Sequence, residues 1–382
     1  MTIAAQASRP PLLHSVQALR GIAALLVVLF HISVFQVATP DGTRELLSGA
    51  PALSLGWVGV DVFFVISGFV MVYIGWSLPS GARQSLKFLR RRALRIYPLW
   101  WAFAGLAAVE FLLTGGRGLA YIINSLLLVP QATSPVLEVG WTLIHEMYFY
   151  ALFALALLLP ARQRLAALLG WTALLLGANL VTPMPGAAEG WLSLALSPLG
   201  LEFSMGAAVG LLVLRGIHRE ARAATWLGAL LFAGALLYPP AVMDTHSTLG
   251  RILLFAAPTN LLLYGVVGLE RTDRLHTPRP LRALGDWSYS LYLSHLFVLS
   301  AGGRVVTLLA ERLPEPLAQH FRFGLAPGAL DIAFLISGTL ASVIVAALAY
   351  RWLEQPLLAL TRRRKPAPDP NATLLACMRA VT

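Results

Sequence analysis

The stretch RGIAALLVVLFHIS, residues 20–33, places a histidine inside an otherwise unbroken apolar run. His31 follows Arg20 by eleven positions, so about 1.5 Å of rise per residue puts roughly 16 Å of helix between the two. A histidine there can simply join two helices through hydrogen bonds. A neutral imidazole shielded from bulk water can also accept a proton near neutral pH, which makes His31 a candidate general base.

Two acidic residues in other apolar stretches could assist such a base. Asp61, in GWVGVDVFFVISGFVM, could orient an imidazole or form an interhelical salt bridge, and Gly68 on the same helical face permits close helix approach. In GWTLIHEMYFYALF, a spacing of four residues puts Thr142, Glu146 and Tyr150 on one helical face. Because a polar stripe is hard to explain against lipid, we expect that face to point into the protein.

A third polar face lies late in the chain, in LGDWSYSLYLSHLF. Ser288, Tyr292 and His295 are spaced so that they share one side of a helix, where they could bind a substrate or join two helices. Glu202 stands alone in an apolar stretch, and we expect it to have a structural role. Buried ionisable groups cost about 2.5–3.5 kcal/mol each on membrane-insertion scales, so this many of them indicates a hydrated interior.

The segment KFLRRRALRIYP is the most basic internal stretch of the chain. As an amphipathic loop, it could anchor the protein to anionic lipid. Alternatively, Arg92 and Arg95, three residues apart, could grip phosphate groups, because a guanidinium bonds phosphate oxygens bidentately. The residues alone leave both interpretations open.

The elements that must position these residues are membrane helices. The chain has 382 residues, 57% of them hydrophobic and only 12% charged, against about 25% charged residues in a typical soluble domain. We therefore predict an all-α polytopic membrane protein, a bundle of about ten transmembrane helices. The predicted spans are 21–38, 55–76, 96–114, 140–160, 165–182, 190–214, 224–243, 249–269, 284–303 and 330–350.

The basic residues indicate the orientation of this bundle. With a cytoplasmic N-terminus, all but six of the 29 Lys and Arg fall on inner loops and ends, as the positive-inside rule requires. The six on the outer side are Arg44, Arg117, Arg251, Arg304, Arg312 and Arg322. Both termini are then cytoplasmic, and the net charge of +11 reflects topology rather than nucleic-acid binding. The single cysteine, Cys377, excludes a cysteine metal site, and we expect no metal.

The predicted organisation is simple. Residues 1–19 form a short cytoplasmic lead, 20–356 the membrane domain, and 357–382 a basic and proline-rich cytoplasmic tail that we expect to be disordered. Residues 115–139 form an outer loop with an apolar piece too short to cross the bilayer, and 304–329 form the longest outer loop.

Taken together and in this order, these stretches resemble the acyltransferase-3 family of bacterial integral-membrane O-acyltransferases. The resemblance extends from about Leu19 to Pro356. The matching motifs are Arg20 with His31, the second-span motif GVDVFFVISGF, the RxxR pair Arg92 and Arg95, GWTLIHEMYFY for W-[ST]-L-xx-E-xx-FY, LGDWSYSLYLSHLF for SYxxYLxH, and Glu354-Gln355-Pro356 for ExP.

This resemblance implies transfer of an acyl group, commonly acetyl, from cytoplasmic acyl-CoA to a hydroxyl of a surface glycan, a lipid-linked sugar or an exported metabolite. Acyl-CoA is then a donor substrate, with no tightly bound cofactor, and the protein sits in the bacterial cytoplasmic membrane. The resemblance implies that His31 is catalytic and that Arg92 and Arg95 take part in function. We predict that Glu146 or Asp61 orients His31 and that Arg20, Arg92 and Arg95 bind the donor. The predicted substrate-binding residues are Ser67, Tyr150, Tyr292 and His295.

Two points qualify the resemblance. The chain has no SGNH-type hydrolase-like domain after the bundle, so it should complete the transfer itself or pass the acyl group to a separate extracytoplasmic partner. A transporter or flippase would also explain a hydrated bundle with buried His and acidic groups, although we find no internal repeat. Consumption of acyl-CoA distinguishes the two, because transport alone requires no such donor.

Overall fold

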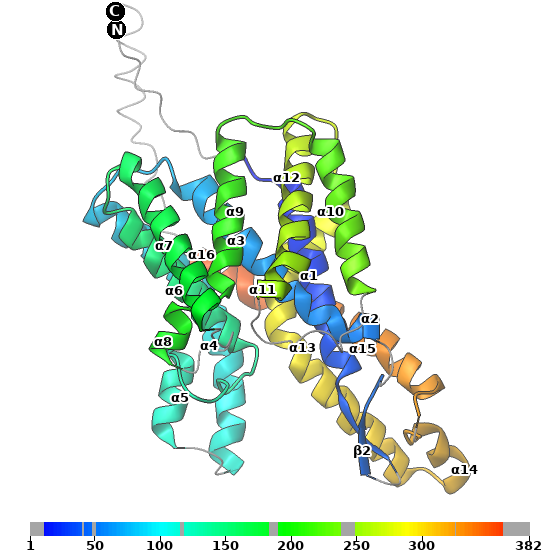
Figure 1. Ribbon diagram of the computed structural model, residues 1–382. Coiled ribbons are helices and arrows are strands. Elements are labelled where there is room, and N and C mark those ends of the chain that lie inside the picture. Colours follow the sequence, from blue (N-terminus) through cyan, green and yellow to red (C-terminus); the bar gives the residue numbers. More distant parts are fainter. Residues whose placement is uncertain are drawn as a thin grey trace, which may run out of the picture.

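A computed structural model describes residues 11–39, 42–47, 51–114, 118–182, 190–237, 249–324 and 326–361. This part of the chain is almost entirely helical (Figure 1). Most of the predicted cytoplasmic tail, from residue 362 onward, lies outside the described residues, and so do residues 1–10 of the predicted lead.

Eight helical segments of the described chain are long and apolar enough to cross a membrane. They are α1 (His14–Ser33), η1 with α3 (Leu55–Val58, Gly59–Gly75), α4 (Ala82–Thr114), α7 (Ala161–Val181), α8 with α9 (Trp191–Ala195, Leu199–Leu214), α11 with η3 and α12 (Leu249–Arg251, Ile252–Ala256, Ala257–Arg271), α13 (Arg279–Arg312), and α15 with η5 and α16 (Ala329–Ala349, Tyr350–Glu354, Gln355–Thr361). The other two predicted spans overlap shorter helices, α6 (Gly140–Ala156) and α10 (Ala221–Leu236). The all-α class and the membrane-helix character are confirmed.

Two predicted loops are helical instead. The basic stretch before the third predicted span belongs to α4, which runs without a break from Ala82 through Pro98 to Thr114. Likewise, α13 continues to Arg312, well into the predicted outer loop. The Arg, Leu and Ala residues in these stretches favour helix, and no proline follows in the second until Pro314. The charges mark where the chain leaves an apolar environment, not where the helix ends.

Short elements complete the described fold. They are β1 (Gln36–Thr39), β2 (Gly42–Glu45), α2 (Pro51–Ser54), α5 (Leu119–Leu126), α14 (Glu315–Ala318) and η4 (Gln319–Phe321). The two strands pair antiparallel, with Gln36 opposite Glu45. Arg44 fixes this hairpin by donating to the backbone oxygens of Leu46 and Gly324 and, at 2.7 Å, to the buried carboxylate of Asp331.

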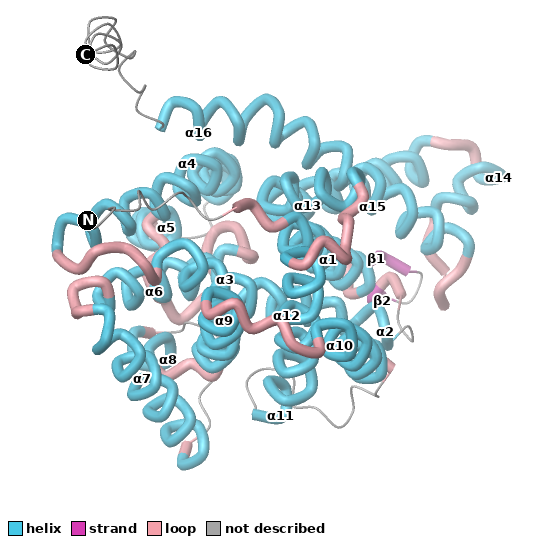
Figure 2. The backbone as a smooth tube through the Cα atoms, turned by 90° about the horizontal axis from the view of Figure 1, so that it is seen from above, coloured by secondary structure: helices cyan, strands magenta, loops and turns pink. Residues whose placement is uncertain are grey.

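Helices α1 and α3 lie toward the centre, with α4, α6, α9, α12 and α13 around them (Figure 2). Small residues bring the central helices together. A Cβ on Gly68 of α3 would collide with the backbone oxygen of Phe203 on α9, and one on Gly206 would collide with that of Val65. The predicted close approach at Gly68 is confirmed, and it holds α3 in the position from which it lines the cavity described next.

Candidate active site

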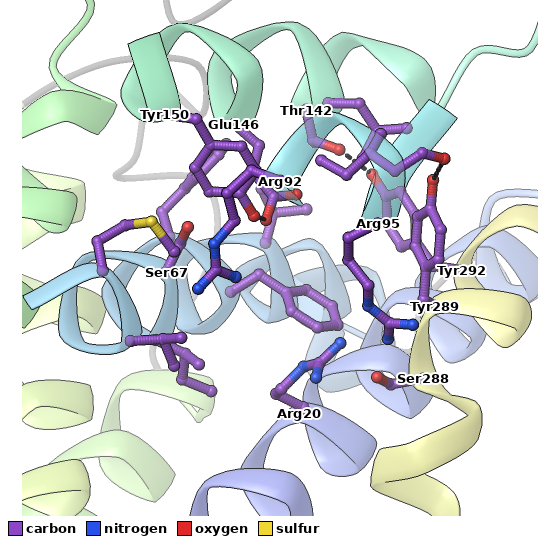
Figure 3. A pocket seen from close by; sticks show the side chains of 18 residues that line it. Arg20, Ser67, Arg92, Arg95, Thr142, Glu146, Tyr150, Ser288, Tyr289 and Tyr292 are labelled. Atoms are coloured by element: carbon purple, nitrogen blue, oxygen red, sulfur yellow. Dashed lines mark hydrogen bonds between the residues drawn. The ribbon is translucent and has the colours of Figure 1, made fainter. Parts of the chain in front are cut away.

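A pocket of about 880 Å³, counting the space at its mouth, lies among α1, α3, α4, α6 and α13 (Figure 3). Its polar lining consists of Arg20, Ser67, Arg92, Arg95, Thr142, Glu146, Tyr150, Ser288, Tyr289 and Tyr292. The remaining lining side chains are apolar and come mostly from α3. The fold therefore brings seven of the ten predicted site residues to one cavity, and leaves His31, Asp61 and His295 outside its lining.

The three arginines of the pocket are held differently. Arg95 donates at 2.5 Å to the carboxylate of Glu354, which is buried and accepts a second hydrogen bond, at 2.7 Å, from Ser290. Arg92 lies over the ring of Tyr150 at 5.5 Å, and Arg20 donates to the side chain of Gln17 at 3.2 Å. Within the described residues, neither Arg20 nor Arg92 forms an ion pair. Two guanidinium groups are thus available for an anionic ligand.

The polar stripe of α6 faces this cavity, as its spacing predicts (Figure 3). The hydroxyl of Tyr150 donates to Glu146. Nearer the other end of the cavity, the hydroxyls of Thr142 and Tyr292 are 2.7 Å apart, and each is 3.0 Å from the backbone oxygen of Val139. Glu146 is therefore positioned by Tyr150 in the pocket, and no hydrogen bond links it to His31.

The partner of His31 is a second histidine. His31 Nδ1 on α1 is 3.2 Å from Nε2 of His295 on α13, and the ring centroids are 4.9 Å apart. His295 Nδ1 is 3.0 Å from the backbone oxygen of Leu291, and His31 Nδ1 is 2.9 Å from that of Val27. A carbonyl only accepts, so in the neutral rings both Nδ1 atoms carry the proton and His295 Nε2 accepts from His31. This tautomer leaves His31 Nε2 as the basic nitrogen.

Tyr292 connects the histidine pair to the cavity. Its side chain lines the pocket, and its ring centroid lies 6.2 Å from that of His295, one helical turn further along α13. On the pocket side, Phe63 packs edge-on against Tyr292 at 5.9 Å. Because Tyr292 lies against His295 and the two histidines bond to each other, the pair adjoins the cavity behind Tyr292.

Asp61, predicted either to orient an imidazole or to form an interhelical salt bridge, forms the salt bridge. Its buried carboxylate receives two hydrogen bonds from Arg251, at 2.7 Å and 2.9 Å. The guanidinium lies 4.2 Å over the ring of Trp57, and Glu202 is buried beside the pair. Arg251 lies at the start of its predicted span, and its buried pairing with Asp61 was not predicted from the sequence. A lone arginine entering an apolar stretch was the available signal.

The comparison with known proteins decides the family. A family model described as an acyltransferase domain matches residues 13–351, nearly the whole described chain. The chain belongs to the acyltransferase-3 family. The acyltransferase is thus an integral membrane protein that transfers acyl groups to oxygen.

Curated relatives agree over most of their length. The acyltransferase is 32% identical over 334 residues to exopolysaccharide production protein ExoZ of Rhizobium meliloti, covering 82% of this chain and 92% of that protein. It is 29% identical over 394 residues to acyltransferase MdmB of Streptomyces mycarofaciens, covering 94% and 95%. It is also 29% identical over 313 residues to the putative membrane-bound transacylase BcsY of Komagataeibacter xylinus, covering 73% and 71%. No solved structure matches the chain.

The structure gives two residues of this acyltransferase contacts at the site that the sequence motifs did not predict. Glu354, known from the sequence only as the first residue of an ExP motif, is the carboxylate that holds Arg95. Tyr289 lines the pocket and donates to the backbone oxygen of Ile96 on α4 at 2.8 Å. Both sit in stretches where polar residues interrupt an apolar pattern, which was the signal available. The described residues contain no group of three His, Cys, Asp or Glu that could hold a metal ion.

Proposed function

We propose that the acyltransferase moves an acyl group, commonly acetyl, from cytoplasmic acyl-CoA to a hydroxyl of a sugar-containing acceptor, with His31 as the general base. The observation that carries this proposal is that an arginine-lined cavity and a histidine pair are neighbours, the pair lying just beyond the Tyr292 end of the cavity. Acyl-CoA acts as a donor substrate and leaves as CoA after each turnover.

The cavity supports the donor. CoA carries three phosphate groups at one end and the thioester at the other. Arg20 and Arg92 have no acidic partner in the described chain, and Arg95 is the third cation of the cavity wall. Guanidinium groups suit phosphates because of their paired donors. Apolar side chains such as Phe63, Phe64 and Met71 give the acyl-bearing arm a dry lining.

The tautomer supports the base. His31 Nε2 removes the proton from the acceptor hydroxyl as its oxygen attacks the thioester carbonyl, so a C–O bond forms. The C–S bond then breaks, and the leaving sulfur takes that proton back from the imidazolium, which restores the neutral ring. His295 and the Val27 carbonyl hold the ring of His31 through the Nδ1 proton, so His295 takes the orienting role predicted for Asp61 or Glu146. A positioned base contributes about 10²–10⁴-fold to the rate.

The other predicted residues take narrower roles in this proposal. Arg20, Arg92, Arg95, Ser67 and Tyr150 contact the donor inside the cavity, and the hydrogen bond between Tyr150 and Glu146 holds both of these side chains in place. Tyr292 closes the end of the cavity nearest the histidines. Asp61 stabilises the bundle rather than taking part in the chemistry, because Arg251 occupies both of its oxygens.

Orientation and acceptor class complete the proposal. The concentration of Lys and Arg on one side of the predicted topology supports an orientation in which the arginines of the cavity face the cytoplasm, where CoA is found. The protein then crosses the bacterial cytoplasmic membrane several times, with the histidine pair toward the outer side. The name of ExoZ refers to exopolysaccharide production, and on that similarity we propose a glycan-like acceptor.

The test is a comparison of cells that contain the protein, lack it, or carry His31→Ala. Mass spectrometry of surface glycans and exported metabolites should reveal an acyl increment only with the wild type. The variant should reach the membrane in normal amount and keep its affinity for CoA. An unchanged acyl increment in His31→Ala would refute the base assignment. A substrate translocated without release of CoA would favour a flippase.

A further inference from the structure

Two serine hydroxyls in the cavity wall have no hydrogen-bond partner. Ser67 on α3 is 9% exposed and Ser288 on α13 is fully buried, and neither Oγ atom bonds to another group of the described chain. Both residues line the pocket, on opposite sides of it (Figure 3). Ser67 is the single polar residue that α3 contributes to the lining.

Hydroxyls in the helices of this protein usually bond to the backbone oxygen four residues earlier. Ser204 bonds to Gly200 at 2.9 Å, and Thr259 bonds to Phe255 at 2.7 Å. Ser67 and Ser288 make no such bond, although each has a backbone carbonyl four residues earlier in its own helix. A buried hydroxyl without a partner costs free energy, so these two are poised for a group that enters the cavity.

The chemistry of the donor identifies that group. Resting on the proposed function, we propose that Ser67 and Ser288 bind the two secondary amides of the pantetheine arm, which joins the phosphates of CoA to its thioester. Each amide offers an N–H and a carbonyl, and a serine hydroxyl can both accept and donate. The arginines bind the phosphates and the apolar wall contacts the acyl end, whereas the amides need neutral polar partners.

Figure 3 is consistent with this division of the ligand. In the view of Figure 3, Ser67 is drawn on the same side of the cavity as Arg92, and Ser288 on the side of Arg20 and Arg95. An arm that extends from phosphates held by these arginines toward Tyr292 therefore runs through the cavity that both serines line.

Binding of CoA to the full-length protein in lipid nanodiscs, measured by calorimetry, tests the inference without an acceptor. Ser67→Ala and Ser288→Ala should each weaken binding about three- to tenfold, the range expected for one net hydrogen bond. Ser294→Ala and Ser342→Ala are matched controls, because these hydroxyls are equally buried and unpartnered but lie outside the pocket lining. The controls should bind CoA like the wild type.

CoA analogues with one amide of the arm replaced by two methylene groups make the test specific. Each analogue should bind the wild type more weakly than CoA does. The variant of the serine that binds the altered amide should show no further loss of affinity with that analogue. Three results would overturn the inference. The Ser67 and Ser288 variants could bind CoA as tightly as the wild type, or the control variants could lose as much affinity as they do. Each serine variant could also show its full loss of affinity with both analogues. If acyl transfer survives such a result, the proposed function stands. If CoA binds as described but no acyl transfer depends on the protein, the function fails and the site remains.

Discussion

His31 and His295 meet across α1 and α13, with 3.2 Å between Nδ1 of the first and Nε2 of the second. The Leu291 carbonyl fixes the tautomer of His295, and His31 shares its Nδ1 proton between the Val27 carbonyl and His295 Nε2. In the proposed mechanism, His295 therefore positions the base, His31, and is not itself the base.

The first prediction concerns this positioning. His295→Ala should lower kcat by about 10²-fold, the size of effect that a small misplacement of a reacting group can produce, and should leave the affinity for CoA unchanged. His295→Gln should retain more activity than His295→Ala, because the amide oxygen of glutamine can accept the hydrogen bond from His31 Nδ1–H in place of Nε2. Equal activity of the two variants, or a wild-type rate in His295→Ala, would contradict the assignment.

The second prediction concerns the buried ion pair of Asp61 and Arg251. Removing one partner leaves the other charge buried, which typically costs about 3–5 kcal/mol, so Asp61→Asn and Arg251→Leu should each lower the thermal unfolding midpoint markedly. The double variant Asp61→Asn with Arg251→Leu should recover much of the loss. Thermal scans in detergent check this, with CoA affinity of the folded fraction as control. A stable Asp61→Asn protein without activity would instead return Asp61 to the chemistry.

These pairings show where sequence reasoning stops. Charged and polar residues inside apolar runs had to face the interior, and this physical constraint predicted most of the cavity lining. The partners were not predictable, because the two histidines are 264 positions apart and Asp61 is 190 positions from Arg251. Which helices become neighbours depends on close approaches such as that at Gly68 and Gly206, whose partners one sequence does not reveal.

The same limit applies to helix ends. Apolar length predicts a helix at each of the ten proposed spans, eight of them in segments long enough to cross a membrane, but it does not predict that α4 begins at Ala82 or that α13 continues to Arg312. Arginine, lysine and glutamate are good helix formers, so a helix can continue past the apolar boundary. In α4 this continuation matters for the site, because it places Arg92 and Arg95 on a rigid element at the pocket wall.

A third prediction separates phosphate binding from lipid anchoring at Arg92. Arg92→Ala should weaken the binding of CoA about tenfold or more and leave that of pantetheine, which lacks the phosphates, unchanged, since charged hydrogen bonds contribute about 1.5–3 kcal/mol. Arg90→Ala, a neighbouring arginine outside the pocket lining, is the matched control. Calorimetry with both ligands measures the difference. Unchanged CoA affinity would leave the basic stretch with its lipid-anchor role.

A fourth prediction concerns Glu354, which holds Arg95 in the wall. Glu354→Ala and Arg95→Ala should each reduce CoA affinity, and the double variant should lose little more than the Arg95 variant alone, because the carboxylate acts through that guanidinium. Glu354→Gln, which can still accept from Arg95, should lose less than Glu354→Ala. Strictly additive losses in the double-mutant cycle would show that Glu354 acts on the donor by another route.

The last prediction concerns Tyr292, which lies between the cavity and the histidine pair. Its hydroxyl is tied to Thr142 and to the Val139 carbonyl, so its ring is held across this end of the pocket. Tyr292→Ala should open that end and admit water to the thioester, so that CoA release without acceptor rises several-fold over the wild type. Tyr289→Ala, which removes another aromatic ring from the lining and leaves Tyr292 in place, is the control. If Tyr292→Ala releases no more CoA than the Tyr289→Ala control, the Tyr292 ring does not separate water from the thioester, and this role of Tyr292 is refuted.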